Sequence, residues 1–372
     1  MNHWQPGPFD SITIEGVNIR NRFVRSATWD STATDDGEVT DASVEMIENV
    51  ARGGVGLIVT GYAYVSDHGK AATRQLGISH GRHIAGMRRL VKAAHDHGAR
   101  IAVQIAHAGV NLALLGHSDR IALAPSKTEG HHSPHRAMTS AEVEEIVRDF
   151  GAAAERAAEA GLDAVQLHGA HGYLMSQFLS PLTNRRTDEW GGSPECRRRF
   201  HVEVMRSVRR AVGENYPIWI KMGLRDHTQD GLQLGEGLAA LRVLRAEGLS
   251  AVEISVGFGA RSARVQRPED DECPYFREDS AAAKRAVDIP VMLVGGIRSL
   301  AMAEDILRRG DADMISMSRP LIREPGLIAR WQRGDTAPAK CISCNKCFGF
   351  GVRGEALECG EERRLREEAG AV

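Results

Sequence analysis

Short apolar runs alternate with longer amphipathic runs along the whole 372-residue chain. Eight of the apolar runs have the length and the β-branched composition of strands, and most are apolar on both faces. The eight expected strands are Arg22–Ala27, Leu57–Gly61, Ile101–Ala106, Ala164–His168, Ile218–Met222, Ala251–Val256, Val291–Gly295 and Met314–Ser318. Strands of this kind are typical of a parallel sheet that helices cover on its faces.

Helical segments separate these strands, and several of them end at a glycine, which is a common helix stop. Thr40 is an expected N-cap, and Thr139 with Glu142 has the spacing of a capping box. The expected helices are Asp41–Arg52, Arg82–His97, a long helix from Thr139 to Ala160, Pro194–Val212, Leu234–Glu247, Glu278–Val287, Ser299–Arg309 and Glu324–Arg333. Eight strands alternating with eight helices predict an α/β protein with a (β/α)8 TIM barrel.

The main alternative is a doubly wound sheet, which usually carries G-x-G-x-x-G after its first strand. Arg22–Ala27 is followed by no such motif, and the literal match that begins at Gly349 follows no strand. We therefore expect a barrel over residues 1–335, followed by a C-terminal extension over residues 336–372 that contains a cysteine cluster and a charged tail.

Composition narrows the class of protein. Hydrophobic residues make up 42% of the chain and charged residues 26%, as in soluble globular proteins. The net charge of −2 offers no basic excess for nucleic acid or an anionic membrane. No apolar run approaches the roughly 20 residues that cross a bilayer, and the N-terminus does not resemble a signal peptide. The expectation is a cytoplasmic protein that acts on a small molecule.

The active site of a TIM barrel lies at the C-terminal ends of its strands. His168 and His171, followed by Tyr173, come at the end of the fourth expected strand. Together these side chains can hydrogen-bond a substrate oxygen and supply a proton. In the alternative, His168 merely ends a core strand and Tyr173 packs under a loop. A His-x-x-His pair can also bind a metal, although the stretch contains no third ligand.

Two further groups fall at strand ends. Gln104 and Lys221 would suit a flat heterocycle with amide-like edges, although Lys221 could instead pair with a nearby carboxylate. Gly295 and Gly296 after the seventh strand, with Ser318 and Arg319 after the eighth, have the position of a barrel phosphate site. Their alternative is two ordinary turns and a solvated arginine.

Several separate motifs resemble the Old Yellow Enzyme family of FMN-dependent ene-reductases, over nearly the whole chain. They are Val103-Gln-Ile-Ala-His-Ala-Gly109, Gln166-Leu-His-Gly-Ala-His-Gly-Tyr-Leu174, Phe178-Leu-Ser-Pro-Leu-Thr-Asn-Arg-Arg-Thr-Asp188 and Glu189-Trp-Gly-Gly-Ser193. The third and fourth motifs are long and specific.

The resemblance implies FMN at the barrel mouth and NADPH or NADH as the electron donor. The residues that correspond to flavin contacts in the family are Ser26, Ala27, Thr28, Tyr62, Gln104, Lys221, Gly296, Ser318 and Arg319. His168 and His171 correspond to the pair that holds the carbonyl oxygen of an enone or enal, and Tyr173 to the proton donor. Hydride would pass through the flavin to the β-carbon of the substrate.

Two positions depart from the family pattern. Lys221 stands where an arginine is usual, and it offers a point charge rather than a planar fork. Trp29 stands where threonine or cysteine is common, and its bulk is expected to reshape the substrate pocket.

The extension carries Cys341, Cys344, Cys347 and Cys359. This spacing resembles the iron–sulfur segment of the larger relatives, the 2,4-dienoyl-CoA reductases and trimethylamine dehydrogenases, although their third cysteine usually comes one residue later. A [4Fe–4S] cluster, a zinc site and reduced thiols without a metal all remain open. A charged helix is expected after Cys359. Those relatives continue into nucleotide-binding domains, which we do not expect here.

The sequence therefore predicts an FMN-dependent NAD(P)H oxidoreductase that reduces the activated C=C bond of an α,β-unsaturated carbonyl compound. One alternative is an amine-oxidising flavoprotein of the trimethylamine dehydrogenase type. The other is a barrel that binds a ligand without catalysis. The natural substrate, the preference between NADH and NADPH, and assembly into a homo-oligomer are not readable from the sequence.

Overall fold

Eight parallel strands form a closed barrel in the computed structural model, which describes residues 6–112, 120–130, 133–259 and 274–370. The barrel strands are β3 (Phe23–Arg25), β4 (Leu57–Val59), β6 (Arg100–Ala106), β9 (Ala164–Gly169), β10 (Ile218–Gly223), β11 (Ala251–Ser255), β12 (Val291–Val294) and β13 (Met314–Met317). Each pairs with the next barrel strand in the chain, and β13 pairs with β3 to close the ring. The predicted TIM barrel and all eight expected strands are confirmed.

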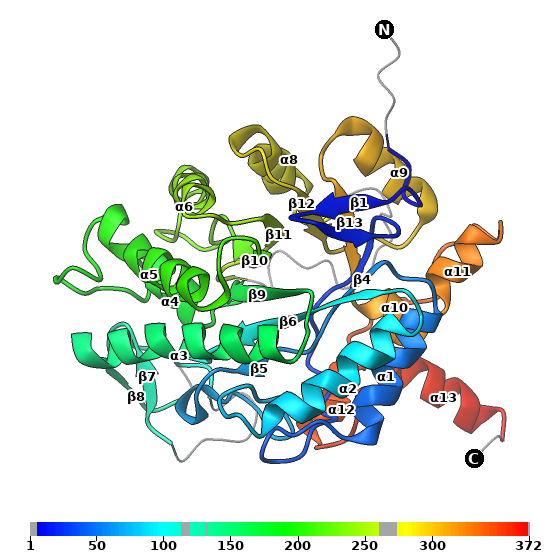
Figure 1. Ribbon diagram of the computed structural model, residues 1–372, viewed down its shortest axis with the longest axis horizontal. Helices are drawn as coiled ribbons and strands as arrows, with labels where there is room; N and C mark the ends of the chain where they lie inside the picture. The colour runs from blue at the N-terminus through cyan, green and yellow to red at the C-terminus, as the bar shows by residue number, and fades with distance from the viewer. Residues whose placement is uncertain (1–5, 113–119, 131–132, 260–273, 371–372) are drawn as a thin grey trace, which may run out of the picture.

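Helices surround the barrel, as Figure 1 shows. They are α1 (Asp41–Arg52), α2 (His83–His95), α3 (Ser140–Glu159), α5 (Pro194–Val212), α6 (Leu234–Ala246), α8 (Arg277–Ala286), α9 (Leu300–Arg309) and α11 (Leu327–Gln332). The hydroxyls of Thr40 and Thr139 accept the expected capping hydrogen bonds. The last helix was predicted to begin at Glu324, which is wrong. Pro325 and Gly326 interrupt the segment, so a short α10 (Arg319–Arg323) precedes α11.

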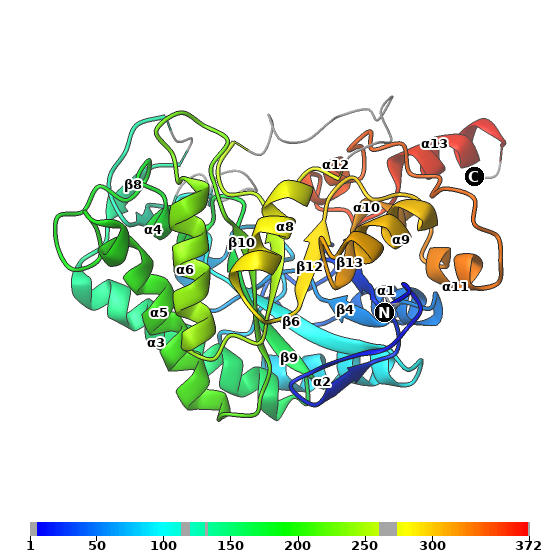
Figure 2. The same cartoon turned by 90° about the horizontal axis from the view of Figure 1, so that it is seen from above.

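An antiparallel hairpin precedes the barrel, and the sequence analysis did not predict it. It joins β1 (Ile12–Ile14) to β2 (Val17–Ile19) through Glu15 and Gly16, both of which have positive φ. Ile14 and Ile19 are buried in a cluster with residues from the lower ends of the barrel strands, such as Trp219. In Figure 2 this dark blue hairpin lies on the side opposite the orange and red C-terminal segment. The hairpin therefore covers the end of the barrel remote from the expected active site.

Small elements fill the loops that follow the strands. They are β5 (Ala63–Tyr64), which pairs with β6, the 3-10 turn η1 (Asp67–Gly69), the parallel pair β7 (Ala122–Ala124) and β8 (His135–Ala137), and α4 (Leu174–Leu179). These elements form a rim around the barrel mouth, which is the end of the barrel where the strands have their C-termini. None of the helices in the described ranges is long and apolar enough to span a membrane.

The C-terminal segment, residues 336–370, folds back onto that rim. It contains α12 (Phe348–Val352) and α13 (Gly360–Glu368), the second of which is the expected charged helix. Its backbone is tied to the barrel at several points: the Leu357 amide donates to the Asp30 carbonyl at 2.8 Å, and Arg74 donates to the Gly354 carbonyl at 2.7 Å. The segment is thus attached to the loops that follow β3 and β5.

Candidate active site

A chain of buried side-chain amides crosses the inside of the barrel near its mouth. Nε2 of Gln104 donates to Oε1 of Gln166 at 2.8 Å, and Nε2 of Gln166 donates to Oε2 of Glu253 at 2.9 Å. Gln104 and Gln166 are register partners on β6 and β9. Each amide is therefore oriented by its neighbour, and the chain ends on a carboxylate.

Glu253 is the centre of this layer, and its side chain is 0% exposed. Its carboxylate accepts from the hydroxyls of Ser26 at 2.7 Å and Ser316 at 2.6 Å, and it lies 3.3 Å from Nζ of Lys221. The Lys221 ammonium also donates to the Ser26 hydroxyl at 2.7 Å. A buried charge is stable when it is paired and hydrogen-bonded, as here.

The alternative considered for Lys221, a pair with a carboxylate, is thus present, while contact with a bound ring remains a prediction. Gln166, Glu253 and Ser316 were not identified from the sequence. The signal was available, because a polar residue in the middle of Val-Gln-Leu or Val-Glu-Ile is as unusual in a buried strand as Gln104 or Lys221.

His168 lies near the end of β9, two residues after Gln166 of the amide chain, and is 3% exposed. Its Nδ1 is buried and has no hydrogen-bond partner among the described residues. Burial lowers the pKa of His168 well below its usual range, and the charge of Lys221 lowers it further. The ring is therefore neutral at physiological pH, with a buried nitrogen that a ligand can satisfy.

His171 is held in a strained conformation beside it. Its φ is +61°, and its backbone N–H donates to the Val256 carbonyl at 2.7 Å. Nε2 lies 2.7 Å from the Ser255 hydroxyl, and the ring centroid is 5.1 Å from that of His168 at an interplanar angle of 88°. Left-handed backbone at a non-glycine residue is costly, and it persists where surrounding contacts enforce it. The two imidazoles are therefore set at a fixed mutual angle.

Tyr173 completes the group from the N-cap position of α4. Its ring centroid lies 4.7 Å from that of His168 and 5.3 Å from that of Tyr62. Burial raises the pKa of the Tyr173 phenol. Burial is also the main reason why the pKa of Tyr62 lies well above its usual value. Both phenols therefore remain protonated at neutral pH. The structure brings His168, His171 and Tyr173 together, and adds the side chain of Tyr62, which was predicted as a flavin contact.

The opposite side of the mouth contains the predicted phosphate residues. Gly295 and Gly296 have φ of +109° and +78°, and a Cβ on either would come within 2.9 or 3.1 Å of the Tyr275 ring. Both positions therefore need glycine. The hydroxyl of Ser318, which precedes α10, lies 2.6 Å from that of Thr28. The backbone from Ser26 to Thr28 thus runs past the same side of the mouth.

Arg319 has partners that the sequence analysis did not foresee. Nη1 donates to Oδ1 of Asn345 at 2.7 Å and to the Ser343 carbonyl at 3.3 Å, and Nη2 donates to the Tyr275 hydroxyl at 3.3 Å. The guanidinium therefore joins the barrel mouth to the C-terminal segment, and its contact with a phosphate remains a prediction.

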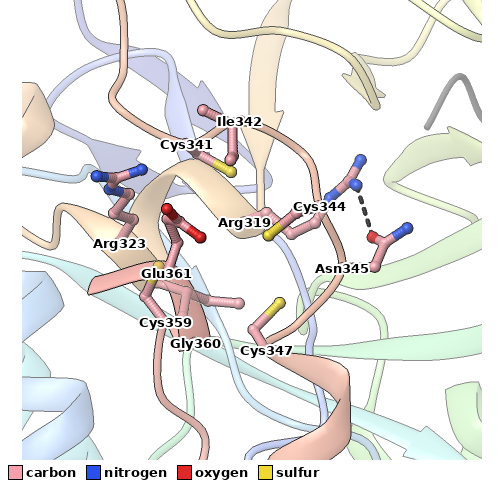
Figure 3. Close-up of a pocket in the computed structure, with 11 residues that line it drawn as sticks. Arg319, Arg323, Cys341, Ile342, Cys344, Asn345, Cys347, Cys359, Gly360 and Glu361 are labelled. Atoms are coloured by element: carbon pink, nitrogen blue, oxygen red, sulfur yellow. Dashed lines mark hydrogen bonds between the residues drawn. The ribbon is translucent and has the colours of Figure 1, made fainter. Parts of the chain in front are cut away.

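The four cysteines Cys341, Cys344, Cys347 and Cys359 gather around one cavity beside Arg319 (Figure 3). Ser343 and Asn345, between the first three cysteines, have φ of +55° and +60°. Burial raises the pKa of the Cys341 and Cys347 thiols. Within the described ranges, no three His, Cys, Asp or Glu side chains are arranged to hold a metal ion. The cysteines are thus collected but not closed around a single ion.

Comparison with known proteins gives consistent relatives. The NADH:flavin oxidoreductase / NADH oxidase family model matches residues 8–337. The chain is 36% identical over 354 residues to an NADH oxidase from Thermoanaerobacter brockii, covering 94% of this chain and 54% of that protein. It is also 36% identical over 321 residues to an NADPH dehydrogenase from Geobacillus sp. (strain WCH70), covering 85% and 91% respectively.

Among solved structures, a 2-naphthoyl-CoA reductase in complex with 2-naphthoyl-CoA superposes with a TM-score of 0.86 at 27% identity, covering 95% of this chain and 56% of that one. The chain spans about half the length of this reductase and of the NADH oxidase. The resemblance drawn from the motifs is confirmed. The chain, with its closed barrel and the histidines and tyrosine at its mouth, belongs to the NADH:flavin oxidoreductase / NADH oxidase family.

Proposed function

We propose that the protein is an FMN-dependent oxidoreductase that takes a hydride from NADPH or NADH and reduces the activated C=C bond of an α,β-unsaturated carbonyl compound. The observation that carries the proposal is the unpartnered, buried Nδ1 of the neutral His168, which lies beside His171 and Tyr173 above a satisfied polar layer. The names of the curated relatives, NADH oxidase and NADPH dehydrogenase, support the same class of reaction.

The residues of the mouth fit FMN. Gln104 and Lys221 provide an amide and a cation for the edge of the ring system. The Tyr275 ring lies against Gly295 and Gly296, so a phosphate would reach the backbone there only after this ring moves aside. We assign the ring to Ser26, Ala27, Thr28, Tyr62, Gln104 and Lys221, and the phosphate to Gly296, Ser318 and Arg319. When bound, FMN supplies the hydride that reaches the β-carbon of the substrate.

His168 and His171 hold the carbonyl oxygen of the substrate. As the C=C bond is reduced, negative charge develops on that oxygen, and prearranged hydrogen-bond donors stabilise it more than they stabilise the ground state. The depressed pKa of His168 keeps this donor neutral, so it stabilises the charge without titrating near pH 6.5. Its contact with the His171 ring limits how far either donor can turn.

Tyr173 donates the proton to the α-carbon. A phenol is protonated at neutral pH, and burial raises the pKa of this one further, so the acid form persists through alkaline pH. The Tyr62 and Tyr173 phenols are hydrogen-bonded to each other, which helps to orient that proton.

A single substitution tests this assignment. Tyr173→Phe is expected to slow reoxidation of the reduced enzyme by 2-cyclohexenone by about 10²- to 10⁴-fold, the usual contribution of general acid catalysis. Reduction by NADPH should change little, because that half-reaction needs no proton from Tyr173. Stopped-flow measurement of both half-reactions provides the comparison.

Tyr216→Phe is the matched control, because the Tyr216 hydroxyl donates to the Leu162 carbonyl outside the mouth. Equal losses in both half-reactions of Tyr173→Phe would contradict the proton-donor role. Wild-type flavin that an amine reduces and NAD(P)H does not would favour the amine-oxidising alternative. A colourless protein that FMN cannot reconstitute would exclude both enzyme functions and favour the third alternative, a barrel that binds a ligand without catalysis.

We also propose that Cys341, Cys344, Cys347 and Cys359 hold a [4Fe–4S] cluster. The four thiols line one cavity, and cysteine thiolates are the ligands that such clusters use. The left-handed backbone at Ser343 and Asn345 and the nearby cations Arg319 and Arg323 also suit an anionic group.

Iron and acid-labile sulfide analysis of anaerobically purified protein tests the cluster, with about four iron atoms per chain expected. Cys347→Ser should lose most of this iron, whereas Cys196→Ser, which changes a free cysteine on α5, should retain it. Fewer than about one iron atom per wild-type chain would exclude the cluster.

A further inference from the structure

Trp29 lies between the C-terminal segment and the aromatic side of the active site. On one side it packs, with Tyr173, against the buried group that contains Tyr62, Ala106 and Ala108. On the other side its ring centroid is 6.4 Å from that of Phe348 on α12. Trp29 is thus the side chain through which the C-terminal segment reaches the neighbours of the proposed proton donor.

Helix α12 is seated directly against the Trp29 ring. A Cβ on Gly351 would lie 2.5, 2.7 and 2.9 Å from three carbons of the six-membered ring, far inside van der Waals contact. The φ of Gly351 is not positive, so space rather than backbone conformation demands glycine there. The glycine two residues earlier differs, because a Cβ on Gly349 would meet only the end of the Arg353 side chain, at 3.2 Å.

Backbone contacts fix this arrangement on both flanks. The Leu357 amide donates to the carbonyl of Asp30, the residue after Trp29, and Arg74 donates to the Gly354 carbonyl. Asp30 in turn accepts from the amide and hydroxyl of Thr32. The indole therefore has little room to turn without displacing α12.

We propose that Trp29 is a specificity-determining wall of the substrate pocket, and that α12 sets its position. Together with Tyr62 and Tyr173 it bounds the aromatic side of the pocket, so its position limits the size of the carbonyl compound that fits. The inference rests on the proposed function. It assigns a second role to the C-terminal segment, because the packing of α12 against Trp29 determines which substrates fit.

Two glycine variants on the same helix provide the test. In FMN-loaded, oxidised protein, the dissociation constants of 2-cyclohexenone and of the larger planar enone benzylideneacetone are measured by flavin difference spectroscopy, which needs no turnover. Gly351→Ala pushes the indole toward Tyr62 and Tyr173. It should weaken the larger probe relative to the smaller by about tenfold or more, the scale on which one methylene discriminates ligands in an apolar pocket. Gly349→Ala should leave the ratio within about twofold.

Trp29→Ala removes the wall, so the ratio should move in the opposite direction, toward the larger probe. This variant carries the test if Gly351→Ala does not fold. Equal ratios in wild type and Trp29→Ala, or in Gly351→Ala and Gly349→Ala, would overturn the inference. Failure of the proposed function is a separate result, because it appears in the wild type and in Gly349→Ala as NADPH-reduced flavin that neither enone reoxidises.

Discussion

Two layers inside the barrel differ sharply, although the same strands build both. Toward the hairpin, the inward residues are apolar, and on β10, β11 and β13 the residues two positions further along are polar or charged. The pairs are Trp219 and Lys221 on β10, Ala251 and Glu253 on β11, and Met314 and Ser316 on β13. A rise of about 7 Å thus separates a layer that stabilises the fold from one suited to binding.

The two layers tolerate change for different reasons. The apolar layer loses burial and gains a cavity when a side chain is shortened, so its losses grow with the volume removed. In the polar layer the loss depends on which partner remains, because a buried charge without a counter-charge is strongly destabilising. Charge pairing rather than volume should therefore dominate substitutions near the mouth.

Glu253→Leu should have the largest effect. It leaves the Lys221 ammonium buried with the Ser26 hydroxyl but without its carboxylate, and it also removes the acceptor for Gln166 and Ser316. We expect a loss of about 3–5 kcal/mol in the free energy of unfolding, measured by urea titration at pH 7.5.

The double variant Glu253→Leu, Lys221→Met distinguishes charge from packing, because it removes both members of the pair. It should recover a large part of that loss, since replacing both charges by apolar groups is often tolerated. A double variant as unstable as Glu253→Leu would show that volume dominates in both layers.

Met314→Ala in the apolar layer comes next. The side chain is 0% exposed, so we expect a loss of about 2–4 kcal/mol in the free energy of unfolding. The loss should be the same at pH 7.5 and pH 5, because the cluster around Met314 contains no titratable group. A loss that varied with pH would contradict this separation of the layers.

Acid should weaken the mouth, and His107, which directly follows β6, is the clearest case there. Burial lowers the pKa of His107 to about 3, whereas the unfolded chain binds that proton at about pH 6.5. The stability linked to this group is complete above about pH 6.5 and falls as the pH drops toward 3, by about 2 kcal/mol at pH 5.

His107→Asn removes this titration while its Oδ1 can still accept the Gly109 amide hydrogen bond that Nδ1 accepts at 3.1 Å. The variant should therefore lose about 2 kcal/mol less than wild type between pH 7.5 and pH 5, as determined from urea midpoints at both values. An unchanged difference between the two pH values would assign the acid sensitivity to other groups.

The fold was largely predictable because strand and helix periodicity is local. All eight barrel strands followed from apolar runs, with ends that differ by one or two residues. The hairpin at the N-terminus was missed although Ile-Thr-Ile and Val-Asn-Ile alternate around Glu15-Gly16, a readable turn signal. The strands β7 and β8, of three residues each, pair across a longer stretch and leave no comparable pattern.

The site was predictable where a polar residue occupies a position in a buried strand that is usually apolar. Gln104, Lys221 and the His168 stretch stood out because polar groups seldom end buried strands without a task. The contacts of Arg319 with Asn345, and of Trp29 with Gly351, were not predictable, because they join segments distant in sequence and depend on where the C-terminal segment settles.

The hairpin of β1 and β2 has one more consequence. Ile14 and Ile19 close the hairpin end of the barrel, so a ligand can reach the barrel only from the opposite end, where the candidate active site lies. Under the proposed function, a nicotinamide donor and an enone would enter from the same end of the barrel, so one would leave before the other binds. The C-terminal segment packs beside that end of the barrel, next to Trp29.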